Sequence, residues 1–181
     1  MVGRQNGGSA TRNPSVFIRD GEIHTDLRDA TNNTTQYAIF SSGLGLSEDA
    51  WYHLAWVKSG SKQYLYIDGI LKDSASAPST CQVDYSYYLG LVDGSANYFE
   101  GDLDNLRFWN DARTQAEIAE YMNRQPMITE SNLVAMYDFN TGTGTTLDDI
   151  TTSSSSNKAT LKTSPTWVKG AIGMFNNNAM N

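Results

Sequence analysis

The feature that most constrains the fold of this chain is a pair of Asp-Gly dipeptides, each placed between two short segments of alternating polar and apolar residues. Asp20-Gly21 follows the segment Val16–Arg19, and Asp68-Gly69 follows Tyr64–Ile67. Asp-Gly is favoured in type I′ turns, which require positive φ angles at both central residues, so each dipeptide predicts a tight β-hairpin. Two such hairpins exclude a mainly helical fold.

Segments with a period of two recur along the chain between clusters of Gly, Asn, Asp and Ser, a pattern typical of all-β proteins. We predict strands at Ser15–Asp20, Glu22–Arg28, Tyr37–Ser41, Trp51–Lys58, Gln63–Ile67, Tyr87–Leu91, Leu103–Trp109 and Leu133–Phe139. So many strands exceed what one flat sheet comfortably holds, and we therefore expect a two-layer antiparallel β-sandwich. The side chains expected to fill the space between the sheets are Trp51, Trp56, Phe99, Phe108 and Trp109.

One helical segment interrupts the strands. Thr114 and Glu117 have the spacing of a capping box, in which each side chain bonds to the backbone of the other residue. Ile118 and Tyr121 then fall on one helical face, and Pro126 follows the end. We predict one short helix of about three turns on the sandwich.

Length and charge limit the possible classes of protein. With 181 residues, the chain is expected to form a single domain over residues 1–181, since β-sandwiches often reach ~200 residues. The net charge of −7 repels phosphate groups, so we expect no nucleic-acid partner and no binding to anionic membranes. An excess of carboxylates is compatible with Ca²⁺ binding, but it equally describes an ordinary soluble surface.

Cysteine and hydropathy give weaker indications of the cellular compartment. Cys81 is the only cysteine, so an intramolecular disulfide is excluded. No apolar segment approaches the ~20 residues that span a bilayer, so we expect no membrane insertion. Residues 1–6 do not have the pattern of a signal peptide, and any secretion signal is expected to lie outside this chain.

Four motifs in a fixed order resemble the laminin-G-like modules of concanavalin A-like proteins and pentraxins. They are Trp51–Val57, Tyr64–Gly69, Tyr98–Asn110 and Glu117–Ile118, followed by a tail that runs from Leu133–Asn140 through Thr166–Val168. The resemblance covers roughly residues 15 to 169. It implies a jelly-roll β-sandwich with ligand recognition in the loops around the rim.

The chain departs from this family at its N-terminus, because the two strands that usually open such modules are not recognisable before Ser15. Residues 171–177 resemble the missing opening strand. Three explanations are open: a circularly permuted module, a slice from a tandem array, or a subunit that donates its terminal strand, residues 170–181, to a neighbour. The last explanation implies a homo-oligomer, since strand addition satisfies an open sheet edge.

An acidic run suggests catalysis, but its pattern is incomplete. Glu100, Asp102 and Asp104 alternate and are expected to share one face of a strand. The run resembles the E-x-D-x-x-E catalytic strand of glycoside hydrolases with the same fold, yet Asn105 stands where that motif has its third acid. A retaining hydrolase needs two carboxyl groups ~5 Å apart, so we expect that the protein is not an enzyme.

The resemblance implies a calcium site for part of the same region, since modules of this family often use an aspartate at the end of a loop. Its expected ligands are Asp93, Asn97, Asp102 and Asp104, which offer the oxygen atoms that Ca²⁺ prefers. A second interpretation stays open: Asp104 and Asn105 bond to their own backbone and form the turn before Leu106.

Tyrosines gather around the predicted loops. Tyr85, Tyr87, Tyr88 and Tyr98 are candidate ligand-binding residues, because exposed rings can stack on sugars while the hydroxyl groups form hydrogen bonds. Packing in the core or at a sheet edge is the alternative. His24 and His53 lie on different strands and form no zinc or catalytic pattern.

Together these features predict a non-enzymatic extracellular or cell-surface module for adhesion or recognition, with a glycan or protein ligand and Ca²⁺ as a supporting ion. The alternative is a structural subunit or decoration of a surface fibre, array or viral particle that associates with copies of itself. Calcium-dependent glycan binding would favour the first hypothesis, and concentration-dependent oligomers the second.

Overall fold

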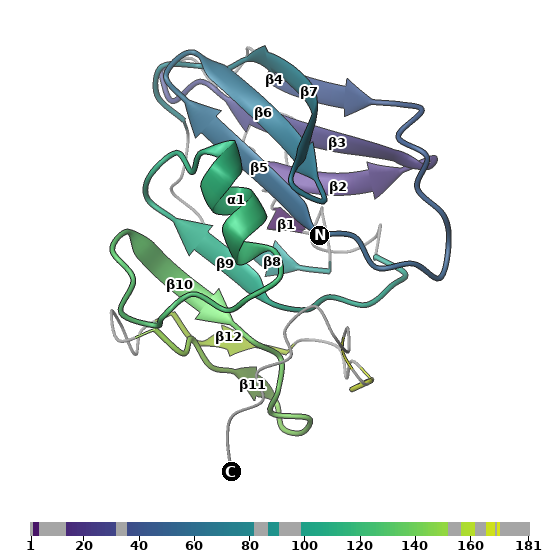
Figure 1. Ribbon diagram of the computed structural model, residues 1–181, viewed down its shortest axis with the longest axis vertical. Coiled ribbons are helices and arrows are strands. Elements are labelled where there is room, and N and C mark those ends of the chain that lie inside the picture. The colour runs from purple at the N-terminus through teal and green to yellow at the C-terminus, as the bar shows by residue number, and fades with distance from the viewer. Residues whose placement is uncertain are drawn as a thin grey trace. The chain divides into compact units, whose positions relative to one another are not determined.

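The computed structural model describes residues 2–3, 14–31, 36–81, 87–90, 99–151, 157–161, 166–168 and 170. The elements are β1 (Val2–Gly3), β2 (Ser15–Arg19), β3 (Glu22–Arg28), β4 (Gln36–Ser41), β5 (Leu54–Ser59), β6 (Lys62–Ile67), β7 (Ile70–Ser76), β8 (Tyr88–Leu89), β9 (Leu106–Trp109), α1 (Gln115–Tyr121), β10 (Leu133–Tyr137), β11 (Thr146–Leu147) and β12 (Ala159–Thr160) (Figure 1). They belong to two compact units, residues 1–101 and residues 102–181. Whether the whole chain is a single domain stays a prediction, because a compact unit need not fold alone.

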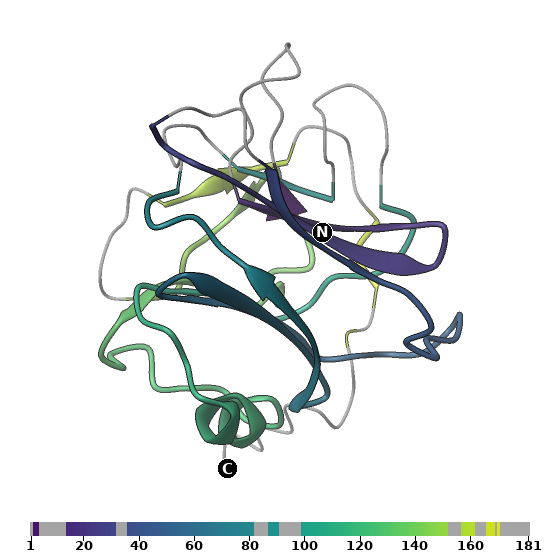
Figure 2. The same ribbon diagram turned by 90° about the horizontal axis from the view of Figure 1, so that it is seen from above.

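The first unit contains two antiparallel sheets. One has the strand order β4-β3-β2-β1-β8 and the other has the order β5-β6-β7. Figure 2 shows β2 and β3 in a layer separate from the layer of the blue three-stranded sheet. Both predicted hairpins are confirmed: Asp20 and Gly21 join β2 to β3 with φ angles of 53° and 77°, and Asp68 and Gly69 join β6 to β7 with φ angles of 50° and 73°.

The core of this unit is aliphatic. Ile23 and Ile39 from the five-stranded sheet form one buried cluster with Leu65 and Ile67 from the three-stranded sheet. Leu65 is completely buried. Burial of these side chains is therefore what holds the two layers together.

The prediction that large aromatic rings fill the core is wrong. Trp51 is 36% exposed, and Trp56, Phe99, Phe108 and Trp109 are only partly buried. Phe108 and Trp109 also belong to the second unit. The physical reason lies partly in the indole N–H of Trp, which needs a hydrogen-bond acceptor and so favours positions at the border of a core.

A buried polar network joins the two sheets. The Thr25 hydroxyl of β3 donates to Gln63 Oε1 of β6 at 2.8 Å, and the Trp56 indole N–H donates to the same oxygen at 3.0 Å. Gln63 Nε2 donates to the Ser76 carbonyl, and the Ile39 backbone N–H donates to Thr25 Oγ1. Thr25 and Gln63 are fully buried, and these bonds satisfy their polar groups in the dry interior.

The second unit is built from two small antiparallel sheets, β10-β9 and β11-β12, and the helix α1. Its buried apolar side chains are Ile118, Leu133, Ala135, Met136, Tyr137 and Leu147. Among the described residues no helix is long and apolar enough to cross a membrane.

The helix confirms the capping-box prediction but is shorter than expected. Thr114 Oγ1 accepts from the Glu117 backbone N–H, and the Glu117 carboxylate accepts from the Thr114 backbone N–H. The helix spans seven residues and ends at Tyr121 instead of continuing for about three turns. Arg107 lies at this end, where its guanidinium donates to the carbonyl groups of Tyr121 and Arg124; the last carbonyl groups of a helix have no intrahelical partners.

Candidate functional site

The predicted tyrosine cluster is described in part. Tyr88 lies in β8 and Tyr87 directly precedes it, while Tyr85 and Tyr98 lie outside the described residues. Tyr87 is 38% exposed. Burial raises the pKa of the Tyr87 phenol to about 12, and the Cys81 thiol, once ionised at high pH, raises this pKa further. The hydroxyl therefore remains a hydrogen-bond donor at neutral pH.

Cys81, which acts on the Tyr87 phenol, is held in a bridge just after the end of β3. Cys81 pairs with Asp29 in an isolated antiparallel bridge, and the Ala30 backbone N–H donates to the Thr80 carbonyl at 3.2 Å. Burial raises the pKa of the Cys81 thiol, so the thiol is neutral at physiological pH. Cys81 is close enough to Tyr87 for its charge at high pH to act on the Tyr87 phenol.

The predicted calcium ligands are not brought together in the described part of the chain. Asp93 and Asn97 lie outside it, Asp102 is exposed, and Asp104 is partly buried. Within the described ranges, no group of three or more His, Cys, Asp and Glu side chains is placed to hold a metal ion. The calcium site stays a prediction.

Asp104 has local roles in the second unit. Burial lowers the pKa of Arg107 to about 10, and the negative charge of Asp104 opposes this shift. A Cβ atom added at Gly170 would lie 2.6 Å from Asp104 Oδ2, so the carboxylate packs directly against that glycine. Asn105 has a φ of 51°, the left-handed conformation of a turn residue.

The acidic run does not form the expected strand. Residues 99–105 have no strand structure, and β9 begins only at Leu106. The left-handed Asn105 separates this run from β9, so the carboxylates precede the strand instead of lying along it. The expectation that Glu100, Asp102 and Asp104 share one face of a strand is therefore wrong.

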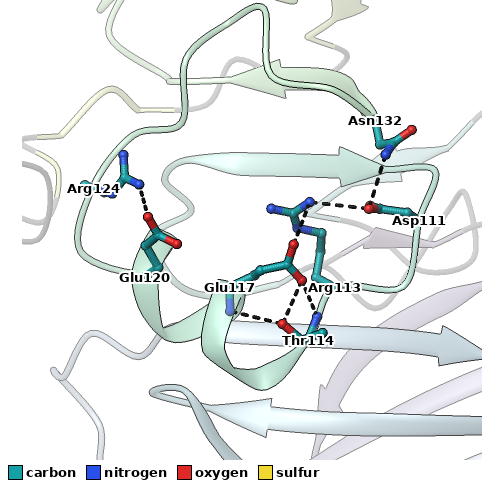
Figure 3. A network of polar contacts seen from close by, with 7 residues as sticks. All are labelled: Asp111, Arg113, Thr114, Glu117, Glu120, Arg124 and Asn132. Carbon is teal, nitrogen blue, oxygen red and sulfur yellow. Dashed lines mark hydrogen bonds and ion pairs between the residues drawn. The ribbon is translucent and has the colours of Figure 1, made fainter.

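A polar network surrounds the start of α1 (Figure 3). The Arg113 guanidinium lies 3.3 Å from Asp111 Oδ2 and 3.2 Å from Glu117 Oε1, and Asn132 Nδ2 donates to the same oxygen of Asp111. Arg113 also lies over the Trp109 ring, 4.1 Å from its centroid. This network fixes the helix on β9 and β10, and we assign it a structural role.

The sequence analysis did not identify a second candidate surface, on the face of the five-stranded sheet that points away from the core. Because side chains alternate along a strand, His24, Asp26 and Arg28 lie opposite the core residue Ile23. His24 is 3% exposed, Asp26 is fully buried and Arg28 is 8% exposed. Arg28 Nε lies 3.3 Å from Asp26 Oδ1. We call this side of the sheet the outer face.

Three rings form a row across the outer face. Phe17 of β2 and Phe40 of β4 are the cross-strand partners of His24. The Phe17 and His24 rings are stacked with centroids 5.2 Å apart, and Phe40 meets His24 edge-on at 5.0 Å. We call these three residues the aromatic row. Strict alternation in Glu22–Arg28 was the only sequence signal for it, and that signal is also typical of a solvated face.

One predicted tyrosine shares the outer face. Leu89 of β8 is the cross-strand partner of Val2 in β1, and Val2 is in turn the partner of Val16 in β2. Val16 packs against the core, so Leu89 is on the core side of the sheet. Tyr88, one residue earlier, therefore belongs to the opposite side of the sheet.

The family model described as the concanavalin A-like lectin/glucanases superfamily, a laminin G model, matches residues 3–119. This is more than half of the chain, and the protein belongs to that superfamily. Its fold is accordingly a mostly β, jelly-roll sandwich with one short helix among the described residues, as the sequence predicted.

Comparison with curated proteins found no match. Among solved structures, an S-layer domain-containing protein from Clostridium thermocellum (residues 221–444) is 21% identical, with a TM-score of 0.32. The alignment covers 66% of this chain and 60% of that one. The likeness is too slight to support an argument about function.

Proposed function

We propose that this protein is a non-enzymatic recognition or adhesion module of the extracellular space or cell surface, which binds a carbohydrate or protein ligand with Ca²⁺ as a supporting ion. The observation that carries the proposal is membership of a superfamily that contains lectins as well as glucanases. Within that choice, the backbone of residues 99–105 favours the lectin side. The acidic run there belongs to no strand, whereas a glucanase needs two carboxylates held at a fixed separation.

Tyr87 supports a role in recognition at the rim. An exposed phenol that stays protonated can stack on a sugar ring or an apolar side chain and still donate a hydrogen bond. The net charge of −7 favours neutral or cationic ligands over polyanions.

The test is an array of glycans and extracellular proteins, probed with the full chain in Ca²⁺ and again in EDTA. We expect a specific signal that weakens in EDTA. A signal that survives EDTA contradicts the calcium part alone. If the array gives no signal and light scattering shows oligomers that grow with concentration, the proposal is contradicted and the self-associating structural subunit is supported. If the protein hydrolyses β-glucan, it is an enzyme and the proposal is also contradicted.

A further inference from the structure

The two Asp-Gly turns of the first unit have the same backbone conformation but different surroundings. In each turn, the Asp and the Gly have positive φ angles and join two paired antiparallel strands. Arg19 and Glu22 form the pair that closes the first turn, and Ile67 and Ile70 close the second. The same dipeptide is therefore held in two environments within one unit.

An Asp-Gly bond can rearrange with water as the only reagent. The Gly backbone nitrogen attacks Cγ of the Asp side chain and loses its proton, and one carboxyl oxygen leaves as water, which closes a five-membered succinimide ring. Water then adds to one of the two ring carbonyl groups. Breaking the bond from nitrogen to the main-chain carbonyl carbon gives isoaspartate, and breaking the bond to Cγ restores aspartate. Glycine permits the attack because no side chain shields its nitrogen.

Asp20 has the freedom that this ring closure needs. Its side chain is 92% exposed, and its Oδ2 lies 3.9 Å from Arg19 Nε, close to the longest distance of an ion pair. Gly21 is also exposed, so water reaches both residues. The Arg19 side chain is 64% exposed, and an exposed end of a hairpin is where local opening costs least.

Asp68 is held in place in the other hairpin. Its Oδ1 accepts from the His53 backbone N–H at 2.8 Å, and its own backbone N–H donates to the His53 carbonyl at 2.9 Å. Gly69 is buried, and Ile67, which closes the turn, belongs to the buried core cluster. Ring closure at Asp68 must therefore break these bonds and displace a turn that is anchored in the core.

We propose that Asp20 is a site of isoaspartate formation in the folded protein and that the fold protects Asp68 from the same reaction. In isoaspartate the main chain passes through Cβ, so the β2–β3 turn gains one backbone atom. The altered turn no longer matches a two-residue hairpin loop, and the hairpin should open at the pair Arg19–Glu22. This inference is independent of the proposed recognition function.

The experiment incubates the full chain in neutral buffer at physiological temperature, folded in one sample and unfolded in guanidinium chloride in another. Its peptides are separated by chromatography, and electron-transfer fragmentation in a mass spectrometer distinguishes isoaspartate from aspartate at each position. Resolution by peptide matters because Asn6-Gly7 and Asp93-Gly94, which lie outside the described residues, can give the same product. In the folded chain, isoaspartate should form several-fold faster at residue 20 than at residue 68. In the unfolded chain the two rates should be similar, because the dipeptides are identical.

The variant Gly21→Ala tests the chemistry at the first turn. Its methyl group shields the attacking nitrogen, and a Cβ atom at this position would meet no other atom within 4 Å. The positive φ of residue 21 makes the variant less stable, so circular dichroism must first show that it is folded. Isoaspartate at residue 20 should then fall several-fold, with residue 68 unchanged as the internal control.

Three results would overturn the proposal. One is a rate at residue 68 of the folded chain that equals or exceeds the rate at residue 20. Another is a difference between the two residues that persists in guanidinium chloride, because it would then come from the neighbouring sequence and not from the fold. The last is a folded chain that forms no isoaspartate at residue 20 while the unfolded chain does, because the first turn would then be protected as well.

Discussion

The two compact units are stabilised by different interactions. The first unit places aliphatic side chains between two sheets and joins the sheets through a fully bonded Gln63. In its described residues, the second unit has only two-stranded sheets. Side chains there bond to the backbone, among them Arg107 at the end of α1 and Asp149 beside β10. A sandwich of sheets buries enough apolar area to hold itself together, whereas small sheets need polar contacts at defined points.

Asp149 shows how the second unit uses such a contact. Its carboxylate accepts from the backbone N–H groups of Met136 and Thr151, from the Thr151 hydroxyl and from Asn157 Nδ2. Burial by itself raises the pKa of Asp149, but these four hydrogen bonds outweigh it and hold the pKa below its ordinary value. One carboxylate thereby fixes the segment after β10 to the strand.

The largest expected effect is in the core of the first unit. Leu65→Ala removes a completely buried side chain and leaves a cavity, so it should lower the free energy of unfolding by about 2–5 kcal/mol. Denaturant unfolding followed by tryptophan fluorescence measures it. Leu71→Ala, at a residue that is 44% exposed, is the control, and equal losses in the two variants would show that the aliphatic core is not what holds the sheets.

The next effect concerns the link between the sheets. Gln63→Ala leaves the Thr25 hydroxyl and the Trp56 indole N–H without their acceptor, and we expect a loss of about 1–3 kcal/mol in addition to the packing change. Gln36→Ala at an exposed position of β4 should be nearly neutral. If the Gln63→Ala variant is as stable as the wild type, the polar network does not contribute to the stability of the first unit.

A smaller, pH-dependent effect is expected in the second unit. Because the folded-state pKa of Asp149 is depressed, its stabilising contribution is fully present above its unfolded value of about 3.8 and is lost as pH falls through the folded value. Asp149→Asn should cost about 1–2 kcal/mol at pH 7. The difference from wild type should shrink in unfolding measured below pH 4, and a difference that stays constant with pH would contradict the assignment.

The smallest effect is at the helix. Thr114→Ala removes the cap of α1 and should lower the free energy of unfolding by about 1 kcal/mol. Thr141→Ala, in an exposed turn, serves as the comparison and should change nothing measurable. Equal stability of the two variants in denaturant unfolding would show that the capping box adds little to the second unit.

Local chemistry explains which parts of the fold were predictable. The Asp-Gly turns and the capping box depend on neighbouring residues, and each appears where the sequence placed it. The end of α1 was not predicted, and the bond that Arg107 makes there joins residues that are far apart in sequence. The identity of the core was missed because aromatic content does not reveal which rings need a polar partner, as Trp56 does.

The candidate site was predictable only in part for a similar reason. Tyr87 is exposed and Tyr88 lies in β8, while a ligand-binding role for either residue stays a prediction. The aromatic row was not foreseen, because Phe17, His24 and Phe40 come together only through the pairing of three strands. The register between strands depends on residues that are far apart in sequence, so it cannot be predicted from single residues.

Burial of β3 on both sides has a consequence for how its sequence can vary. Six of the seven residues of β3 are buried, so most substitutions in this strand should be destabilising. Buried polar residues such as Asp26 are as constrained as Ile23. The strand β7 at the edge of the three-stranded sheet, whose residues are mostly exposed, should accept far more replacements in saturation mutagenesis. In related chains, the sequence of residues 22–28 should consequently change more slowly than that of any other strand in its sheet.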